Sequence, residues 1–431
     1  MPLCYPKKTI MGFIQWRHDY WPVIIMILIC LLNEVVLASV FLVSILIIFL
    51  IIKHILYSKE LTWIVLSAFL VRLVFIVIDE LFQVYNYALD STYYNIVAGQ
   101  IINNYIHNVS VFYRIIEPSV VKYYSLFISI FYYILGNNQI YIRILNGFLG
   151  ALAVAVVYSI CQRIFPNKKV AYWASLLTAF YPSCILFTSL NLRDSLILYL
   201  SLEMINQFLK ASDRNFKTGR SLLFLILVII IGLLRPQNFF LFSLIIIIYF
   251  FIVFMLGDYS YKVKLLFLLI LFSIVGILFV YQNELILEFI EYPLRALPRR
   301  AIGGSAYLAD LMYHSLFDII KYAPIRFLYF TFGPFFWDVK NLLMLIAFLE
   351  SIFIMFIFYL SFKYLRHPSG YEKNNHLLFL FLFGLFGLIA NALVDSNYGT
   401  VIRHRMVYII PFIIFASANL INKDNRVCPS T

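Results

Sequence analysis

The sequence predicts an all-α membrane protein that crosses the bilayer many times. Of its 431 residues, 63% are hydrophobic and only 13% are charged, and the mean hydropathy is +0.91. Soluble domains are close to half apolar and a quarter charged. Apolar runs of about 17 to 25 residues, long enough to cross a bilayer, follow one another along the chain. We therefore expect a single transmembrane domain over residues 1–431, with roughly twelve spans.

The apolar runs differ in length, and the first is long enough for a helical hairpin broken at Asn33-Glu34. We expect residues 1–60 to form an N-terminal tail and this hairpin. The expected spans, with the hairpin counted as one run, are 21–56, 61–78, 139–160, 170–190, 194–210, 220–235, 238–256, 264–281, 341–362, 376–394 and 406–421. Residues 123–135 are also apolar. A span there would invert every later loop, so we expect an interfacial or re-entrant helix.

The basic residues predict the orientation of the chain in the membrane. Lys and Arg gather in loops such as CQRIFPNKK and FKYLRHPSGYEKNN, which share one side if the spans alternate. The positive-inside bias makes this side cytoplasmic, together with both termini and the tail 422–431. Two long loops, 79–138 and 282–340, would then lie outside and carry interfacial helices. We expect a multi-pass protein of the bacterial cytoplasmic membrane, in contact with membrane lipids.

The composition argues against several other classes of protein. The formal net charge is +12, but the basic residues sit mainly in short loops and leave no basic domain that could bind a nucleic acid. The five cysteines have neither paired spacing nor a histidine cluster, so neither a disulfide framework nor a zinc site is predicted. The sequence also has no Gly-rich nucleotide-binding motif.

Three acidic residues stand out at the start of the first long loop. Asp79 and Glu80 end an apolar helix, where the helix dipole disfavours negative charge. A carboxylate at the membrane boundary could act as a general base toward a hydroxyl group, and a helix-end pair that faces water is the alternative. Asp90 precedes an amphipathic helix, where it could also serve as the N-cap. Together, Asp79 and Asp90 could hold a divalent cation, and metal dependence stays open.

Arginines at the expected outer ends of helices are candidates for binding a phosphate group. Arg403 and Arg405 begin the last span, where the helix N-terminus and two guanidinium groups would attract an anion. Arg235 has no near acidic neighbour in the sequence and is predicted to bind the same kind of anion. The alternative is that these arginines reach the membrane interface and anchor the protein to lipid headgroups.

A further positive cluster lies in the second long loop. Arg299 and Arg300 precede the pair Gly303-Gly304, a pattern typical of a mobile lid. A lid that closes over a phosphate or pyrophosphate would use these arginines, and contacts with anionic lipids would explain them equally well.

These features together resemble the GT-C superfamily, integral-membrane glycosyltransferases such as the protein O-mannosyltransferases and the aminoarabinose transferase of lipid A. The resemblance lies in the acidic pair of VIDELF, the further Asp90, the short alternating loops and the Arg-x-Arg before the last span. QIYIRILNGFLGALAVAVVYSICQRIF is also similar to the family's Arg-containing second membrane segment. The chain departs from the family in its extra N-terminal hairpin, and it lacks a Pro-Pro or Lys-Pro-Pro element and a soluble outer domain.

The resemblance implies an inverting enzyme that moves a sugar from a polyprenyl-phosphate donor to a hydroxyl acceptor on the outer face of the membrane. The acceptor could be a glycan, a lipid or a protein. Asp79 would be the catalytic base, with Asp90 beside it, and Arg403 and Arg405 would hold the phosphate.

Two other functions stay open on the sequence. A polysaccharide polymerase or ligase of the O-antigen or capsule type would depend on residues 295–300 and 403–405 and would not need Asp79. A transporter of lipid-linked saccharides would instead place charges at mid-membrane depth, whereas most of the charges here lie at helix ends.

Overall fold

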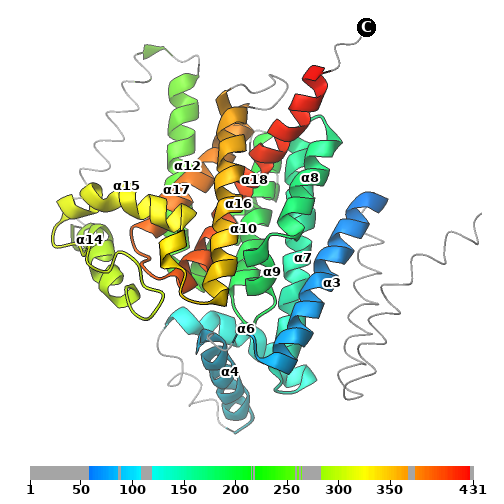
Figure 1. The fold of residues 1–431 in the computed structure, drawn as a ribbon, viewed down its shortest axis with the longest axis vertical. Helices are drawn as coiled ribbons and strands as arrows, with labels where there is room; N and C mark the ends of the chain where they lie inside the picture. Colours follow the sequence, from blue (N-terminus) through cyan, green and yellow to red (C-terminus); the bar gives the residue numbers. More distant parts are fainter. Residues whose placement is uncertain are drawn as a thin grey trace, which may run out of the picture.

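The computed structural model describes residues 58–85, 89–107, 119–214, 216, 219–257, 260, 261, 264, 283–366 and 374–427. These residues fold into a bundle of α-helices, with one isolated β-bridge between Ala306 and Asn397 and no β-strand (Figure 1). The predicted all-α class is confirmed.

The described helices take up most of the chain (Figure 1). They are α3 (Lys59–Phe82), α4 (Leu89–His107), α6 (Ser119–Leu135), α7 (Gln139–Ile164), α8 (Lys168–Ala179), α9 (Pro182–Thr188), α10 (Asp194–Ser212), α11 (Gly219–Leu234), α12 (Pro236–Leu256), α14 (Asn283–Arg300), α15 (Leu316–Phe332), the short 3-10 helix η2 (Phe336–Asp338), α16 (Leu342–Arg366), α17 (Asn374–Ala392) and α18 (Tyr398–Val427).

Six of the described helices are long and apolar enough to cross a membrane, namely α3, α7, α12, α16, α17 and α18. α8 and α9 meet at a bend of 56° and together form a broken span or a re-entrant loop. α11 is a shorter apolar helix, and α10 is not among the candidate spans. The expected runs 21–56 and 264–281 lie outside the described residues. The polytopic membrane class is thus confirmed, and the total of twelve spans is not.

Polar caps define where several helices begin. The Ser58 hydroxyl accepts a hydrogen bond from the backbone N–H of Leu61 at 3.3 Å at the start of α3. The Asn138 side chain accepts one from the N–H of Ile140 at 3.0 Å at the start of α7. These side chains satisfy N–H groups that the helix itself leaves unpaired.

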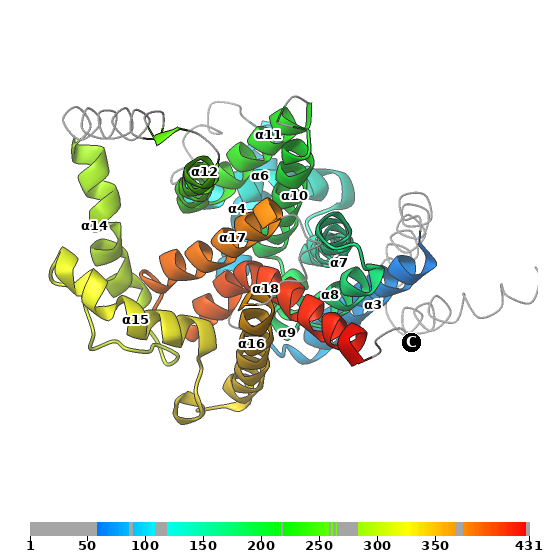
Figure 2. The ribbon, with the colours of Figure 1, turned by 90° about the horizontal axis from the view of Figure 1, so that it is seen from above.

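The interior of the bundle is built around α18, which is 89% buried over its apolar window and packs against α16, α17 and α8 (Figure 2). Glycines allow close approach at two contacts. A Cβ atom at Gly387 of α17 would lie 2.0 Å from the Tyr408 ring in α18, and one at Gly150 of α7 would lie 2.7 Å from Nε of Arg72 in α3. Neither position can take a larger residue without moving its neighbour.

The two long loops both carry helices, as the sequence predicts. α4 packs against α6 at the end of the bundle where α3 finishes and α7 begins (Figure 1). The apolar residues 123–135 fall in α6, which is not one of the candidate spans. α14 and α15 lie at the side of the bundle (Figure 2). The side of the membrane that these helices face remains a prediction.

Candidate active site

The acidic pair lies in the last turn of α3 and shares one guanidinium group. Asp79 Oδ2 lies 2.7 Å from Nη2 of Arg143 in α7, and Glu80 Oε2 lies 2.9 Å from Nη1. Arg143 is buried and donates its Nε–H to the carbonyl oxygen of Ser189 at 3.1 Å. Arg143 therefore supplies the favourable charge that the helix dipole denies to this pair. Two carboxylates and one guanidinium leave one net negative charge, so the group can accept a proton.

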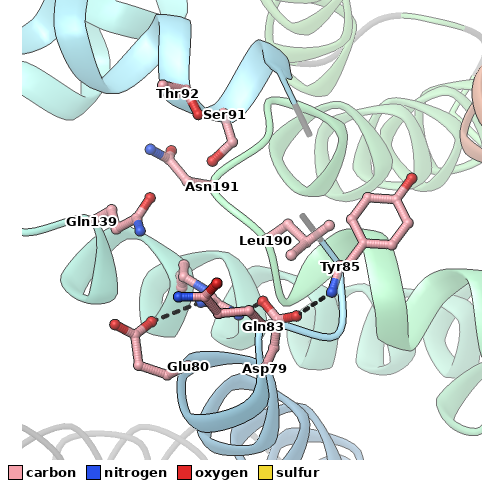
Figure 3. Close-up of a pocket in the computed structure, with 10 residues that line it drawn as sticks. Asp79, Glu80, Gln83, Tyr85, Ser91, Thr92, Gln139, Leu190 and Asn191 are labelled. Carbon is pink, nitrogen blue, oxygen red and sulfur yellow. Dashed lines mark hydrogen bonds and ion pairs between the residues drawn. The ribbon is translucent and has the colours of Figure 1, made fainter. Parts of the chain in front are cut away.

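The turn after α3 fixes the carboxylate of Asp79. Gln83 ends the helix in the left-handed region with φ of 49°, and its N–H donates to the Asp79 carbonyl oxygen at 2.8 Å. The chain then brings the Tyr85 N–H within 2.7 Å of Asp79 Oδ1 (Figure 3). Both side-chain oxygens of Asp79 are thus bonded. Glu80 Oε1 has no hydrogen-bond partner among the described residues, and the Glu80 side chain is 46% exposed, so the pair remains accessible.

A small polar cavity opens beside the acidic pair (Figure 3). We call it the smaller cavity; its volume is about 230 Å³. Its walls come from the end of α3, the start of α4, the start of α7 and the turn before α10. Its lining residues are Asp79, Glu80, Gln83, Tyr85, Ser91, Thr92, Gln139, Arg143, Leu190 and Asn191.

A second network of charges joins α4, α10, α12 and α18. Arg403 of α18 lies 2.9 Å from Asp90 Oδ2 through Nη1 and 2.9 Å from Asp194 Oδ2 through Nη2. The buried carboxylate of Asp194 also binds Arg235, with Nη2 2.9 Å from Oδ1. The Asp90 side chain is 54% exposed and lies in the first turn of α4, so it serves here as a partner of Arg403.

A larger cavity of about 1090 Å³ lies between α3, α9, α16 and α18. We call it the larger cavity. Much of its wall is apolar, with Phe75, Ile185, Leu186, Phe187, Leu343, Met344, Ile346 and Ala347. Its charged lining residues are Asp90, Arg299, Arg300, Lys340, Glu350 and Arg403. Tyr85 lines both cavities, so the two adjoin. Burial raises the pKa of Tyr85, so its hydroxyl stays protonated at neutral pH.

The cations of the larger cavity differ in how they are paired. Arg403 is held by two carboxylates, and Arg300 forms an ion pair with Asp395. Arg299 is exposed and has no carboxylate partner in the described part of the chain. Lys340 makes one hydrogen bond, from Nζ to the carbonyl oxygen of Gly304 at 3.2 Å. Arg299 and Lys340 are therefore the cations available to an anionic ligand.

Two of the predicted phosphate-binding arginines, Arg235 and Arg405, are buried and paired with carboxylates of the bundle. Arg235 has no acidic neighbour close by in the sequence, but in the structure it is paired with Asp194, 41 positions earlier in the chain. Arg405 points into the bundle, where its Nη2 lies 3.1 Å from Glu350 Oε1 and none of the side chain is exposed. Neither arginine lines either cavity, so the donor site proposed below includes neither.

The segment with the glycine pair is tied to the turn between α17 and α18. The Tyr307 N–H donates to Ser396 O at 3.0 Å, and the Tyr398 N–H donates to Ser305 O at 3.0 Å. Burial alone would raise the pKa of Asp395 in this turn, but His404 and Arg300 outweigh it and lower that pKa to about 2. A lid movement here would have to break these contacts, so our proposal involves none.

A metal site at Asp79 and Asp90 finds little support in this arrangement. The two residues line different cavities, and each carboxylate is bonded to an arginine that a cation would have to displace. Within the described ranges, no group of three or more His, Cys, Asp or Glu side chains could hold a metal ion.

Several residues of this site could not be predicted from the sequence. Arg143 stood within the segment that resembles the family, but nothing in the sequence paired it with Asp79, 64 positions away. Asp194 is next to Arg193 in the sequence, but its ion pairs are with Arg235 and Arg403. No sequence pattern marked Lys340 or Asn191 as a site residue.

Comparisons with known proteins bear on the fold. A family model described as dolichyl-phosphate-mannose-protein mannosyltransferase matches residues 120–281, which include Arg143 and Asp194 and leave out the acidic pair. No curated protein matches the sequence. The structure is similar to the oligosaccharyltransferase of Archaeoglobus fulgidus in its apo form, with a TM-score of 0.50 and 15% identity. The match covers 86% of this chain and 51% of that one, so the chain spans about half the length of this relative.

The family model and the solved structure both belong to the GT-C superfamily. The family match includes neither the acidic pair nor the arginines of the last helix, and the solved structure shares the helical fold. The resemblance of this membrane protein to the GT-C superfamily is therefore confirmed, and its fold is a GT-C fold.

Proposed function

We propose that the protein is a membrane glycosyltransferase that moves a sugar from a polyprenyl-phosphate donor to a hydroxyl acceptor. One observation carries this proposal. A polar cavity with an accessible acidic pair adjoins a larger cavity with apolar walls and with cations that have no carboxylate partner in the described part of the chain, and Tyr85 lines both. Transfer from a lipid-linked sugar needs a polar site in which a base meets the acceptor hydroxyl. Beside it, the reaction needs an apolar site with cations for the lipid tail and the phosphate.

The larger cavity suits the donor. Its apolar wall from α9 and α16 would take the first isoprene units of the lipid, since burying apolar surface is favourable. Arg299 and Lys340 would bind the phosphate, and Arg403, already held by Asp90 and Asp194, lies in the wall of the same cavity. Guanidinium and ammonium groups suit phosphate oxygens and stabilise the charge that develops on a leaving phosphate.

The acidic pair would serve as the base. The acceptor hydroxyl oxygen attacks the anomeric carbon on the face opposite the phosphate, and a new glycosidic C–O bond forms. The C–O bond to the phosphate breaks, its electron pair stays on the lipid phosphate, and configuration inverts. The hydroxyl proton passes to the group formed by Asp79, Glu80 and Arg143, whose single net negative charge can take it. No nucleotide sugar takes part.

We further propose that the reaction occurs on the outer face of a bacterial cytoplasmic membrane, with both termini inside. The support is the distribution of Lys and Arg among the loops, which favours that orientation. In the structure, α4 and α6 lie at the end of the bundle where α3 finishes (Figure 1), and the last turn of α3 carries the acidic pair.

The test is to incubate the purified protein with polyprenyl-phosphate sugars and envelope extracts and to follow loss of the donor and gain of a glycosylated product by mass spectrometry. We expect donor loss that depends on the sugar and that the Asp79→Asn variant abolishes. Transport of the intact donor into liposomes without any sugar transfer would contradict the proposal and favour a transporter. Full-length polymer in cells that carry Asp79→Asn, but not in those that carry Arg299→Gln, would favour a polymerase.

A further inference from the structure

The lining of the smaller cavity is almost entirely polar. Of its ten lining residues in the described part of the chain, only Leu190 has an aliphatic side chain. The others offer three amides, two hydroxyls, a phenol, two carboxylates and a guanidinium. A cavity with this lining would bind a ligand that carries many hydroxyl groups of its own.

One of these polar groups, the side-chain amide N–H of Asn191, has no well-placed partner within the described residues. The side chain of Asn191 is buried with 1% exposed, and its Oδ1 accepts from the Tyr124 hydroxyl at 3.2 Å. Its Nδ2 lies beside the Tyr132 hydroxyl and has no partner with good hydrogen-bond geometry among the described residues. The neighbouring Tyr132 hydroxyl donates to Asn95 Oδ1 at 2.7 Å. Figure 3 shows Asn191 between Ser91 and Thr92 on one side and Gln139 on the other. A buried N–H group without a partner is costly, and a ligand hydroxyl in the cavity would satisfy it.

The size and surroundings of the cavity narrow the ligand further. At about 230 Å³ it is smaller than the roughly 300–1,000 Å³ of sites for drug-sized ligands. The described residues around the cavity are helices and turns without a strand, so the cavity offers no sheet edge to which an extended peptide could add. A terminal sugar ring, compact and rich in hydroxyls, fits both limits.

We infer that the smaller cavity binds a sugar, so that the acceptor hydroxyl belongs to a carbohydrate and not to a serine or threonine of a protein. This inference rests on the proposed function and deepens it. Asn191 and Gln139 would position the acceptor sugar by hydrogen bonds, and the acidic pair at the other side of the cavity would receive the proton of the reacting hydroxyl.

The experiment offers the full-length protein one donor and two classes of acceptor, alkyl glycosides of common envelope sugars and peptides rich in Ser and Thr. We expect transfer to at least one glycoside and none to the peptides. In Asn191→Leu and in Gln139→Leu the KM for the glycoside should rise about tenfold, the effect of one lost hydrogen bond, with little change in donor affinity. Gln237→Leu is the matched control, because Gln237 lies at the start of α12 outside both cavities.

A second readout does not depend on turnover. Saturation-transfer NMR should detect binding of the glycoside to the wild-type protein and to Gln237→Leu, and the signal should be lost in Asn191→Leu. Transfer to peptides alone, or absence of glycoside binding in the wild-type protein, would overturn the inference and leave the proposed function intact. Failure of every lipid-linked sugar to react with any acceptor would instead defeat the proposed function, and the inference with it.

Discussion

Two clusters of carboxylate and guanidinium groups in this bundle show why similar residues can have different roles. At the end of α3, two carboxylates share Arg143, and one of them is half exposed beside a cavity. Between α16 and α18, Glu350 faces Arg405, and neither side chain is more than 3% exposed. Ser183 adds bonds to Glu350, from its N–H at 2.9 Å and from its hydroxyl at 2.6 Å.

The difference lies in charge and access. The first cluster keeps one net negative charge and a carboxylate oxygen that is free among the described residues, so it can bind a ligand or a proton. The second has one carboxylate for one guanidinium, and its bonds join α9, α16 and α18. We therefore expect the first cluster to act in the reaction and the second to stabilise the fold.

The largest effect should come from Asp79→Asn. The amide keeps the shape of the side chain but cannot accept the proton, so we expect the rate of sugar transfer to fall by about 10²- to 10⁴-fold, the usual contribution of a general base. Initial rates by mass spectrometry provide the measurement, with donor affinity and thermal stability as controls. A loss that is larger in Glu80→Gln than in Asp79→Asn would assign the proton to Glu80.

Substitutions in the second cluster, Glu350 and Arg405, should lower the stability of the folded protein. Glu350→Gln leaves the guanidinium of Arg405 buried without a carboxylate, and removing one partner of a buried ion pair costs about 3–5 kcal/mol. We expect a lower unfolding temperature and a lower yield of folded protein in detergent. The double variant Glu350→Gln with Arg405→Met should recover part of the loss, because no unpaired charge remains. If single and double variants are equally unstable, charge pairing is not the cause.

Substitutions in the proposed donor site should have a smaller effect, on the KM for the donor. Arg299→Gln and Lys340→Gln each remove a cation that has no carboxylate partner in the described structure, so we expect the KM for the polyprenyl-phosphate sugar to rise about tenfold in each. The matched control is Arg295→Gln, since Arg295 is exposed, pairs with Glu291 at 3.0 Å and lines neither cavity. An equal rise in all three variants would indicate a general effect of surface charge.

The sequence was sufficient for the features that depend on short stretches of chain. The run 61–78 became α3, longer by a few residues at each end because Ser58 caps its start and Gln83 ends it. Charge partners could not be predicted, because they depend on how distant helices pack. Arg403 meets Asp90 across 313 positions. Both Arg403 and Arg405 looked alike as anion ligands, but only Arg403 lines a cavity. Residues two apart on an α-helix point in nearly opposite directions, but the sequence could not show which of the two faces a cavity.

The smallest predicted effect comes from substitution of Asp90. It tests whether α4 helps to position residues of the smaller cavity. The ion pair of Asp90 with Arg403 is half exposed, and such pairs contribute about 0–1 kcal/mol. We expect Asp90→Asn to slow sugar transfer about threefold, because α4 carries Ser91 and Thr92 into the smaller cavity and this pair helps to hold it there. High salt should weaken the wild-type pair in the same way, so that the difference between wild type and variant shrinks as ionic strength rises. A loss as large as that of Asp79→Asn, unaffected by salt, would instead make Asp90 part of the proton-accepting group and extend that group across both cavities.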